Sequence, residues 1–430
     1  MLIALLGFAI AIVLIFARVP IAIALGFVGF AGFAGLNGMG PALGMVALST
    51  STSTMSYHLA VIPLFVLMGN LVAGAGISAD LYRAAQAFIG HRRGGLAIAT
   101  IASCGGFAAV CGSSVATVVT MGKVSIPSMR SHGYSDRLST ATVAAGGTLG
   151  ILIPPSILMV IYGVTTETHI GKLFAAGLLP GLVGIVGYAV AVRWVVYRDP
   201  ASAPPAERAS APERWLAVRR IWATALLFGL VLGGIYGGLF TATEAGGIGA
   251  AGALVLALVR RIDRKAFYDI LEDTVSTTAV LFALIIGASI FTEFINYTGA
   301  HKNVLHLVQD SGLSPLSVLF LIIGIYIVLG CVLDSLAMML LTLPLFFPIV
   351  TGLGYDPVWF GILIVMLMEL GLITPPIGIN LFVLKTIVPD VPLATIIRGI
   401  VPFVVADVGR IALLVAIPGL ALWLPGQFFK

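Results

Sequence analysis

Two Pro-Pro pairs, Pro154-Pro155 and Pro375-Pro376, interrupt long apolar segments in the two halves of this chain. Hydrophobic residues make up 59% of the 430 residues and charged residues only 10%, whereas soluble domains carry about 25% charged residues. The composition therefore predicts a membrane protein. In lipid every backbone N–H and C=O must be bonded internally, so an interrupted helix persists only where protein or a water-filled cavity accepts the freed groups. Two matching interruptions indicate one shared internal binding site.

Ten apolar segments are long enough to cross a bilayer, which takes about 20 helical residues. They cover roughly residues 1–17, 20–38, 57–77, 138–166, 170–197, 221–239, 243–259, 274–295, 357–385 and 399–424. Two further apolar stretches, about 95–129 and 315–350, have polar or glycine-containing centres and are predicted to be re-entrant hairpins. The predicted fold is all-α and polytopic, with about ten crossings, two re-entrant hairpins and two broken helices.

One constant shift, the shift that carries Pro154 onto Pro375, places the first half of the chain on the second half and predicts an internal repeat. The matched pairs are Ser113 with Asp334, Ser114 with Ser335, Ala116 with Ala337, Pro127 with Pro348, Gly150 with Gly371, Pro154 with Pro375 and Pro155 with Pro376. We therefore divide the chain into a first repeat at 1–197, a polar linker at 198–220 and a second repeat at 221–430.

Each repeat contains five crossings, an odd number, so the second repeat must be inverted relative to the first. If the linker is cytoplasmic, 19 of the 23 Lys and Arg residues fall on the cytoplasmic side, as the positive-inside rule requires. The exceptions are Lys172, Lys302 and Lys430 outside, and Arg410 within a span. This orientation predicts that both termini are periplasmic, that the first hairpin enters from the cytoplasm, and that the second enters from outside.

In each repeat a hairpin tip with small polar residues is predicted to meet a helix break near the membrane midplane. Proline removes a donor and clashes with the preceding turn, which frees carbonyl oxygens. Free carbonyls together with Ser, Thr and Asp oxygens suit a hard cation, and sodium is the natural occupant. The first predicted sodium site is Gly112, Ser113, Ser114, Gly150, Pro154 and Ser156. The second is Asp334, Ser335, Gly371, Thr374 and Pro375.

The half-helices that follow the breaks would present N–H groups and a positive dipole end to a carboxylate substrate. Ser156, Thr374 and Asn380 are the candidate substrate-binding residues. In the alternative interpretation, the proline pairs are simple kinks and the serines bond back to their own helices. Repetition of the whole pattern in both halves favours the binding sites. We expect sodium as the coupling ion, no organic cofactor and no transition metal.

Several ionisable residues within apolar stretches have open roles. Asp334 is expensive in lipid unless it pairs with a cation or a proton, and we expect it to bind sodium. Glu369 is either a second carboxylate or proton carrier at the site, or a carboxylate bonded to backbone between domains. Asp407 and Arg410, three residues apart, can pair on one helix face; a structural role or a partner contact is the simpler interpretation.

Other functional classes find little support in the sequence. Cys104, Cys111 and Cys331 lack metal-ligand spacing, and no GxSxG, Walker or HExxH pattern is present, so we expect no enzyme. The net charge of +5 reflects membrane orientation rather than nucleic-acid binding. A channel needs a continuous polar path, whereas the polar groups here gather at two tips and two breaks.

Several segments resemble the large membrane subunit of tripartite ATP-independent periplasmic (TRAP) transporters over essentially the whole chain. They are Gly112-Ser-Ser-Val-Ala-Thr117, Gly150-Ile-Leu-Ile-Pro-Pro-Ser156, Tyr236-Gly-Gly-Leu-Phe-Thr-Ala-Thr-Glu-Ala245, Thr374-Pro-Pro-Ile-Gly-Ile-Asn380 and Ile417-Pro-Gly-Leu-Ala-Leu-Trp-Leu-Pro425. The resemblance implies a sodium-driven importer of an organic anion in the bacterial inner membrane, with an elevator-type mechanism. It also implies two partners: a periplasmic substrate-binding protein and a small four-helix membrane subunit on a separate chain.

By matching segments, the resemblance assigns Ser113, Ser114 and Ser156 to one sodium ion and Asp334 with Thr374 to another. Some family members carry Asp at the position of Thr117 and Ser at that of Cys111, so the polar network around the first site differs here. The alternative is a self-sufficient sodium/dicarboxylate symporter of the same architecture. Such symporters typically carry Ser-Asn-Thr at the hairpin tips, where this chain has Gly-Ser-Ser and Asp-Ser.

Overall fold

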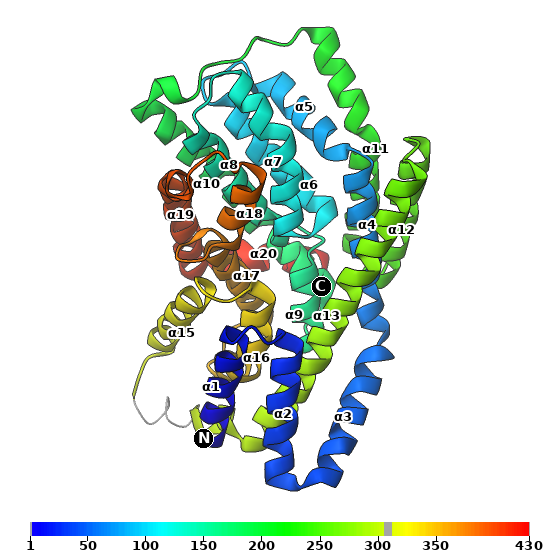
Figure 1. Cartoon of the computed structure of the whole chain (residues 1–430), viewed down its shortest axis with the longest axis vertical. Helices are drawn as coiled ribbons and strands as arrows, with labels where there is room; N and C mark the ends of the chain where they lie inside the picture. The colour runs from blue at the N-terminus through cyan, green and yellow to red at the C-terminus, as the bar shows by residue number, and fades with distance from the viewer. Residues whose placement is uncertain (1, 305–311, 430) are drawn as a thin grey trace.

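The computed structural model describes residues 2–304 and 312–429, and these ranges contain helices and no β-strand (Figure 1). Met1 and Lys430 lie outside the described residues. In the first half the helices are α1 (Leu2–Phe16), α2 (Ile21–Asn37), α3 (Met39–Thr54), η1 (Tyr57–Ala60), α4 (Val61–Gly74), α5 (Ile77–Ile89), α6 (Gly95–Cys111), α7 (Ser114–Ser131), α8 (Asp136–Thr148), η2 (Leu149–Ile151), α9 (Ile157–Thr165) and α10 (Ile170–Arg198).

The second half follows a short linker and repeats the same order of long helices. It contains η3 (Pro200–Ser202), α11 (Ala211–Tyr236), α12 (Ala242–Val259), α13 (Arg264–Thr298), α15 (Pro315–Gly330), α16 (Ser335–Gly352), α17 (Pro357–Ile373), α18 (Ile379–Ile387), α19 (Leu393–Ala416) and α20 (Gly419–Phe428). The predicted all-α polytopic fold is confirmed. Seven described helical segments are long and apolar enough to span a membrane, and five shorter helices are similarly apolar.

The shift that relates the two Pro-Pro pairs also relates whole helices. It carries both ends of α7 onto the two ends of α16, and it carries the first residue of α2 onto that of α12. Helix contacts follow the same relation, because α2 packs on α13 as α12 packs on α4. α10 and α19 occupy equivalent places in the two halves and pack on each other. The halves are therefore joined where equivalent helices meet.

The two hairpins enter the molecule from opposite ends, which shows that the repeats are inverted. α6 and α7 form the first hairpin in the upper half of Figure 1, and α15 and α16 form the second in the lower half. The central helix α17 is buried from Val358 to Ile373, and α8 is buried from Leu138 to Thr148. α17 is apolar and buried all round, as is typical of a helix in the middle of a large protein, whereas α8 is buried although it carries Ser139, Thr140 and Thr142. Both helices lead into the Pro-Pro breaks.

Several boundaries differ from those expected from the sequence, among them α5, which has no expected counterpart, and three of the differences have a clear local cause. α3 has no counterpart among the expected helices; its Ser/Thr-rich end is accommodated because Thr52 and Thr54 donate to carbonyls four residues earlier. α11 begins at Ala211, inside the predicted linker, because Ser210 and Glu213 form a capping box. The predicted span 399–424 is really α19 followed by the separate helix α20, since Pro418 cannot donate within a continuing helix.

The remaining linker is docked on the base of the first hairpin. Gly94, just before α6, donates its N–H to Ala203 O, and Ser135, just after α7, donates to Ser202 O. Ala206 donates to Gly90 O. Both ends of the hairpin are thus held by the segment that joins the two repeats.

Candidate functional site: two hairpin tips and two broken helices

The first hairpin tip is Gly112-Ser113, at the junction between α6 and α7. Gly112 adopts a left-handed conformation with φ of 64°, which favours glycine. A Cβ atom at this position would lie 2.9 Å from Pro155 O, so the tip touches the break directly. Ser113 is the N-cap of α7, and its Oγ accepts from Ala116 N at 3.4 Å. Ser114 begins the helix and is buried.

The first helix break lies between α8 and α9 and is buried throughout. A Cβ atom at Gly150 would lie 2.7 Å from Ser113 O, so only glycine lets the tip and the break approach this closely. Ser156 is the N-cap of α9 and donates from Oγ to Ile151 O at 2.5 Å. Pro154 belongs to the same buried segment, and the bond between it and Pro155 is cis. The structure thus brings together the residues predicted for the first site.

The second hairpin tip pairs with the second break in a comparable way. Asp334 is the N-cap of α16 and accepts from Leu336 N at 3.1 Å, while Ser335 is buried behind it. A Cβ atom at Gly371 would lie 2.6 Å from Gly330 O. Ile377 of the break donates to Cys331 O of the tip. Backbone contact between tip and break therefore recurs in the second repeat.

The two breaks differ in exposure. In the second break Thr374 donates to Leu370 O at 2.5 Å, and the Pro375-Pro376 segment after it is exposed, as is the Asp334 side chain. The equivalent residues Pro154 and Pro155 are buried. In this conformation the second site therefore opens to the surface, whereas the first is enclosed.

Asn380, predicted to bind substrate, is buried and bonded to the first repeat. Its Nδ2 donates to Ser114 Oγ at 2.9 Å and to Ala144 O at 3.1 Å. The other two candidate substrate residues, Ser156 and Thr374, both donate to backbone carbonyls. Asn380 thus joins the helix after the second break to the hairpin of the first repeat.

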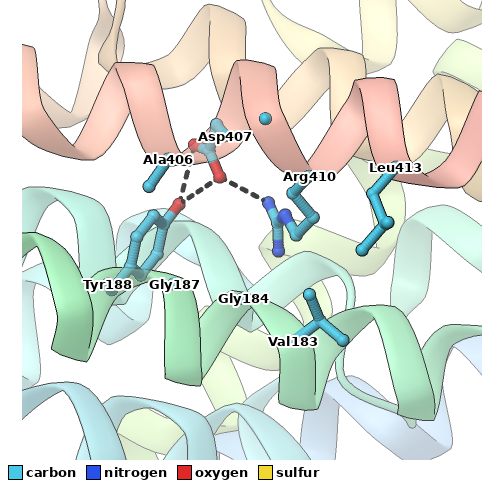
Figure 2. Close-up of a pocket in the computed structure, with 9 residues that line it drawn as sticks. Val183, Gly184, Gly187, Tyr188, Ala406, Asp407, Arg410 and Leu413 are labelled. Carbon is cyan, nitrogen blue, oxygen red and sulfur yellow. Dashed lines mark hydrogen bonds and ion pairs between the residues drawn. The ribbon is translucent and has the colours of Figure 1, made fainter.

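A buried charged cluster lies between α10, α17 and α19 and contains Glu369, Asp407 and Arg410, three of the ionisable residues predicted within apolar stretches. Arg410 Nη2 donates to Asp407 Oδ1 at 2.7 Å and to Glu369 Oε2. Figure 2 shows Asp407 and Arg410 beside Tyr188, which donates to both carboxylate oxygens of Asp407 at 2.9 and 2.7 Å. The predicted Asp407/Arg410 pair is confirmed. Glu369 binds the Arg410 guanidinium, which was in neither interpretation of this residue.

Sequence reasoning missed two further members of this cluster, Tyr188 and Thr148. The Tyr188 hydroxyl lies 2.9 Å from Thr148 Oγ1, and Thr148 is the last residue of α8 before the first break. A usable signal was present, because the shift that carries Pro154 onto Pro375 also carries Thr148 onto Glu369.

Outside the membrane-spanning segments, one charged contact ties the first hairpin to the second repeat. Arg130, in the last turn of α7, donates to Asp136 and to Asp390 at 2.6 Å each. The Arg130 hydrogen bond holds the pKa of Asp390 below its ordinary value of 3.8. A cavity of about 330 Å³ next to this contact is lined by Lys123, Arg130 and Asp390.

Backbone carbonyl, hydroxyl and carboxylate oxygens, the donor types that hard cations take as ligands, gather at the tips and breaks, and the helix N-termini beside them favour negative charge. Ser113, Ser156 and Asp334 each occupy the N-cap of a helix that starts at a tip or a break. Within residues 2–304 and 312–429, no three His, Cys, Asp or Glu side chains are grouped so that they could hold a metal ion. Any cation here would depend largely on backbone oxygens.

A fold of inverted repeats with broken helices and re-entrant hairpins defines a class of secondary transporters. Comparison with known proteins is specific: residues 8–420 match the family described as "Tripartite ATP-independent periplasmic transporter, DctM component". The chain belongs to this family and is a multi-pass membrane component of a tripartite transporter.

The relatives agree with this assignment, and a solved structure shares the fold. The chain is 37% identical to the C4-dicarboxylate TRAP transporter large permease protein DctM of Pseudomonas aeruginosa, over 88% of this chain and 89% of the relative. It is 32% identical to the sialic acid TRAP transporter large permease protein SiaM of Vibrio cholerae, over 96% of each. The crystal structure of the Alcanivorax borkumensis YdaH transporter matches with a TM-score of 0.61 at 16% identity, over 91% of this chain and 90% of that one. That likeness concerns the fold alone.

Proposed function

We propose that this chain is the large transmembrane subunit of a sodium-coupled importer that takes a small carboxylate from a periplasmic binding protein. The observation that carries the proposal is the paired contact of a polar hairpin tip with a helix break in each repeat: Gly112 against Pro155 and Gly330 against Gly371. The freed carbonyls and the side-chain oxygens beside them are ligands that sodium accepts.

Sodium coupling is supported by the position of Asp334. A carboxylate within a membrane hairpin is costly unless a cation or a proton accompanies it, and Asp334 lies exposed at the open second tip. The second ion would bind there with Thr374, and the first at the enclosed tip with Ser113, Ser114 and Ser156. The different oxygen donors of the two sites imply different sodium affinities.

A carboxylate substrate is supported by the N-terminal ends of α9 and α18, which face the breaks and favour negative charge. The relatives named above, together with the ectoine TRAP transporter large permease protein TeaC of Halomonas elongata at 36% identity, are named for molecules that all carry a carboxylate. The isethionate TRAP transporter permease protein DctMQ of Oleidesulfovibrio alaskensis, 30% identical, is named for a sulfonate. We therefore propose a small organic anion, with a carboxylate as the first class to test, and leave the particular acid to the binding protein.

In this proposal the chain lies in the bacterial inner membrane with both termini in the periplasm, the second hairpin entering from the periplasm, and the linker in the cytoplasm. A small four-helix membrane subunit completes the membrane part, and the hairpins and broken helices move together as an elevator. The orientation is tested with Cys331→Ala chains that carry a cysteine at Glu207 or at Lys172. A membrane-impermeant maleimide applied to whole cells should label the cysteine at 172 and not the one at 207; the opposite pattern contradicts the orientation.

The function itself is tested in liposomes that contain the chain with or without the small subunit, plus a binding protein loaded with its acid. Uptake should require a sodium gradient and both partners. Uptake by the chain alone would favour the alternative, a self-sufficient sodium/dicarboxylate symporter. Asp334→Asn should abolish sodium-dependent uptake, and because Asn also caps helices well, the folded protein should persist. Asp356→Asn, at the N-cap of α17, is the matched control and should retain uptake.

A further inference from the structure

We infer that a chain of five hydrogen-bonded side chains couples the two proposed sodium sites, so that an ion at one break changes the sodium affinity of the other. The chain runs from Thr148 through Tyr188, Asp407 and Arg410 to Glu369. The inference rests on the proposed function, since it presupposes ions at both breaks. It makes Tyr188, Asp407 and Arg410 positioning residues for the sites rather than ligands.

The two ends of this hydrogen-bond chain occupy equivalent places next to the two breaks. Thr148 directly precedes η2, which carries Gly150 of the first site. Glu369 lies two residues before Gly371 of the second site, or about 3 Å along the helix axis at 1.5 Å per residue. A displacement of either break therefore moves one end of the hydrogen-bond chain.

The middle of the hydrogen-bond chain is continuous and shielded from solvent. Asp407 and Glu369 are 0% exposed and Arg410 is 4% exposed. An ionised carboxylate can only accept hydrogen bonds, so the Tyr188 hydroxyl hydrogen is directed to Asp407. The Tyr188 oxygen then accepts from Thr148, whose one hydroxyl hydrogen is shared with Ala145 O, 2.8 Å from Thr148 Oγ1. At Asp407 the link passes from α10 to α19, the two helices at which the repeats meet.

Coupling between distant sites requires an element with two arrangements. Arg410 provides a second arrangement of the hydrogen-bond chain. Nη2 serves both carboxylates, whereas Nε and Nη1 have no hydrogen-bond partner among the described residues. The guanidinium lines a cavity of about 200 Å³ together with Gly184 and Gly187 (Figure 2). In the proposed coupling the guanidinium turns and offers Nε or Nη1 to Asp407 or Glu369.

The direction of the effect follows from charge. Arg410 is shared by two carboxylates, and in a low-dielectric interior such interactions are strong. A sodium ion at the second break attracts the Glu369 carboxylate, which loosens its hold on Arg410 and strengthens the bond between Arg410 and Asp407. Asp407 then holds Tyr188, and through it Thr148, more firmly beside the first break. Ion binding at one break thus orders the other, which gives positive cooperativity.

Tyr188→Phe tests the coupling because it removes one hydroxyl from the middle of the hydrogen-bond chain and keeps the buried ring. The matched control is Tyr162→Phe. Tyr162 is also buried, and its hydroxyl donates to Pro357 O, a contact that likewise joins the two repeats. Among the described residues it forms no bond to the hydrogen-bond chain. A merely structural role for these hydroxyls would change the melting temperature of both variants and the sodium cooperativity of neither.

Sodium binding is measured on the purified full chain by calorimetric titration with sodium chloride, at ionic strength held constant with choline chloride. Two coupled sites should give a Hill coefficient that approaches about 2 in the wild type and in Tyr162→Phe, since the number of sites is its upper limit. In Tyr188→Phe the Hill coefficient should fall to about 1, and the half-saturating sodium concentration should rise about 5-fold or more. Thr148→Val removes the hydroxyl at the end of the hydrogen-bond chain and should give the same result. It decides the question if Tyr188→Phe does not fold.

The outcomes separate this inference from the proposed function. If the wild type binds sodium with a Hill coefficient of about 1, or if Tyr188→Phe and Thr148→Val keep the wild-type value, the coupling is wrong and sodium transport still stands. If the wild-type chain binds no sodium, the proposed function is wrong and the coupling fails with it.

Discussion

Asn380 of α18 donates to Ser114 of α7 across 266 residues of sequence, with 2.9 Å between Nδ2 and Oγ. This bond joins the helix after the second break to the first turn after the first hairpin tip, and Ala144 O accepts from the same amide. The residues of the two predicted ion sites are therefore linked directly across the two repeats.

Replacement of Asn380 by Ala should lower the free energy of unfolding by about 1–3 kcal/mol, because Ser114 and Ala144 O then remain buried without this partner. The measurement is thermal unfolding of the detergent-solubilised chain. Asn70→Ala is the control; the Asn70 amide donates to Thr274, whose hydroxyl also bonds to Ile270 O and so keeps a partner. Equal melting temperatures for Asn380→Ala and wild type would show that the bond contributes nothing.

Gly150→Ala and Gly371→Ala should each force a tip away from its break, because the added Cβ would lie 2.7 Å from Ser113 O or 2.6 Å from Gly330 O. Overpacking of this kind costs about 1–3 kcal/mol, and sodium binding by calorimetry should weaken in both variants. Gly233→Ala, within α11 and with no atom within 4 Å of the added Cβ, should be neutral or slightly stabilising. Wild-type sodium affinity in the first two variants would remove the tips from the ion sites.

Arg410→Met should destabilise the chain by about 3–5 kcal/mol, since it leaves the Glu369 and Asp407 carboxylates buried without their cation. The double variant Arg410→Met with Glu369→Gln removes one of those charges as well and should recover part of the loss. Arg137→Met is the control, because its guanidinium is exposed and, within residues 2–304 and 312–429, donates to Arg398 O alone. Unfolding in denaturant measures all three; a double variant less stable than Arg410→Met would contradict the pairing.

The contact between Arg130 and Asp390 predicts an acid sensitivity at the base of the first hairpin. The pKa of Asp390 is lower in the folded protein than its ordinary value of 3.8. Its contribution is therefore complete above the unfolded pKa and is lost as pH falls through the lower folded pKa. Melting temperatures of wild type and Asp390→Asn, measured from neutral to acid pH, should converge below pH about 4. A difference that persists unchanged at the acid end would contradict this account.

Much of the fold follows from the sequence because membrane helices obey simple rules. Backbone bonding in lipid enforces helices, and the Pro-Pro pairs mark the breaks, so the hairpins and broken helices appear at the predicted places. The boundaries that failed depend on local detail. The capping box of Ser210 with Glu213 extends α11 beyond its apolar part, and Pro418 divides the last apolar run.

The charged cluster could be predicted only in part. Asp407 and Arg410 are three residues apart, which is enough to predict their pairing, whereas Tyr188 and Asp407 are 219 residues apart. No helical periodicity connects such residues, because their contact is fixed by how α10 packs on α19. The same limit applies to Asn380, whose partners lie in the other repeat. Long-range polar contacts depend on packing, which periodicity alone does not determine.

The cluster between α10 and α19 makes the two repeats complementary parts that cannot be interchanged. The second half supplies Glu369, Asp407 and Arg410, and the positions one repeat earlier than the last two are Val186 and Ala189. A chimeric chain built from two second halves would bury four carboxylates against two guanidinium groups, and one built from two first halves would have none of these charges. An ancestor made of identical halves would have needed other contacts between these two helices. The present contacts therefore depend on divergence of the two halves after duplication.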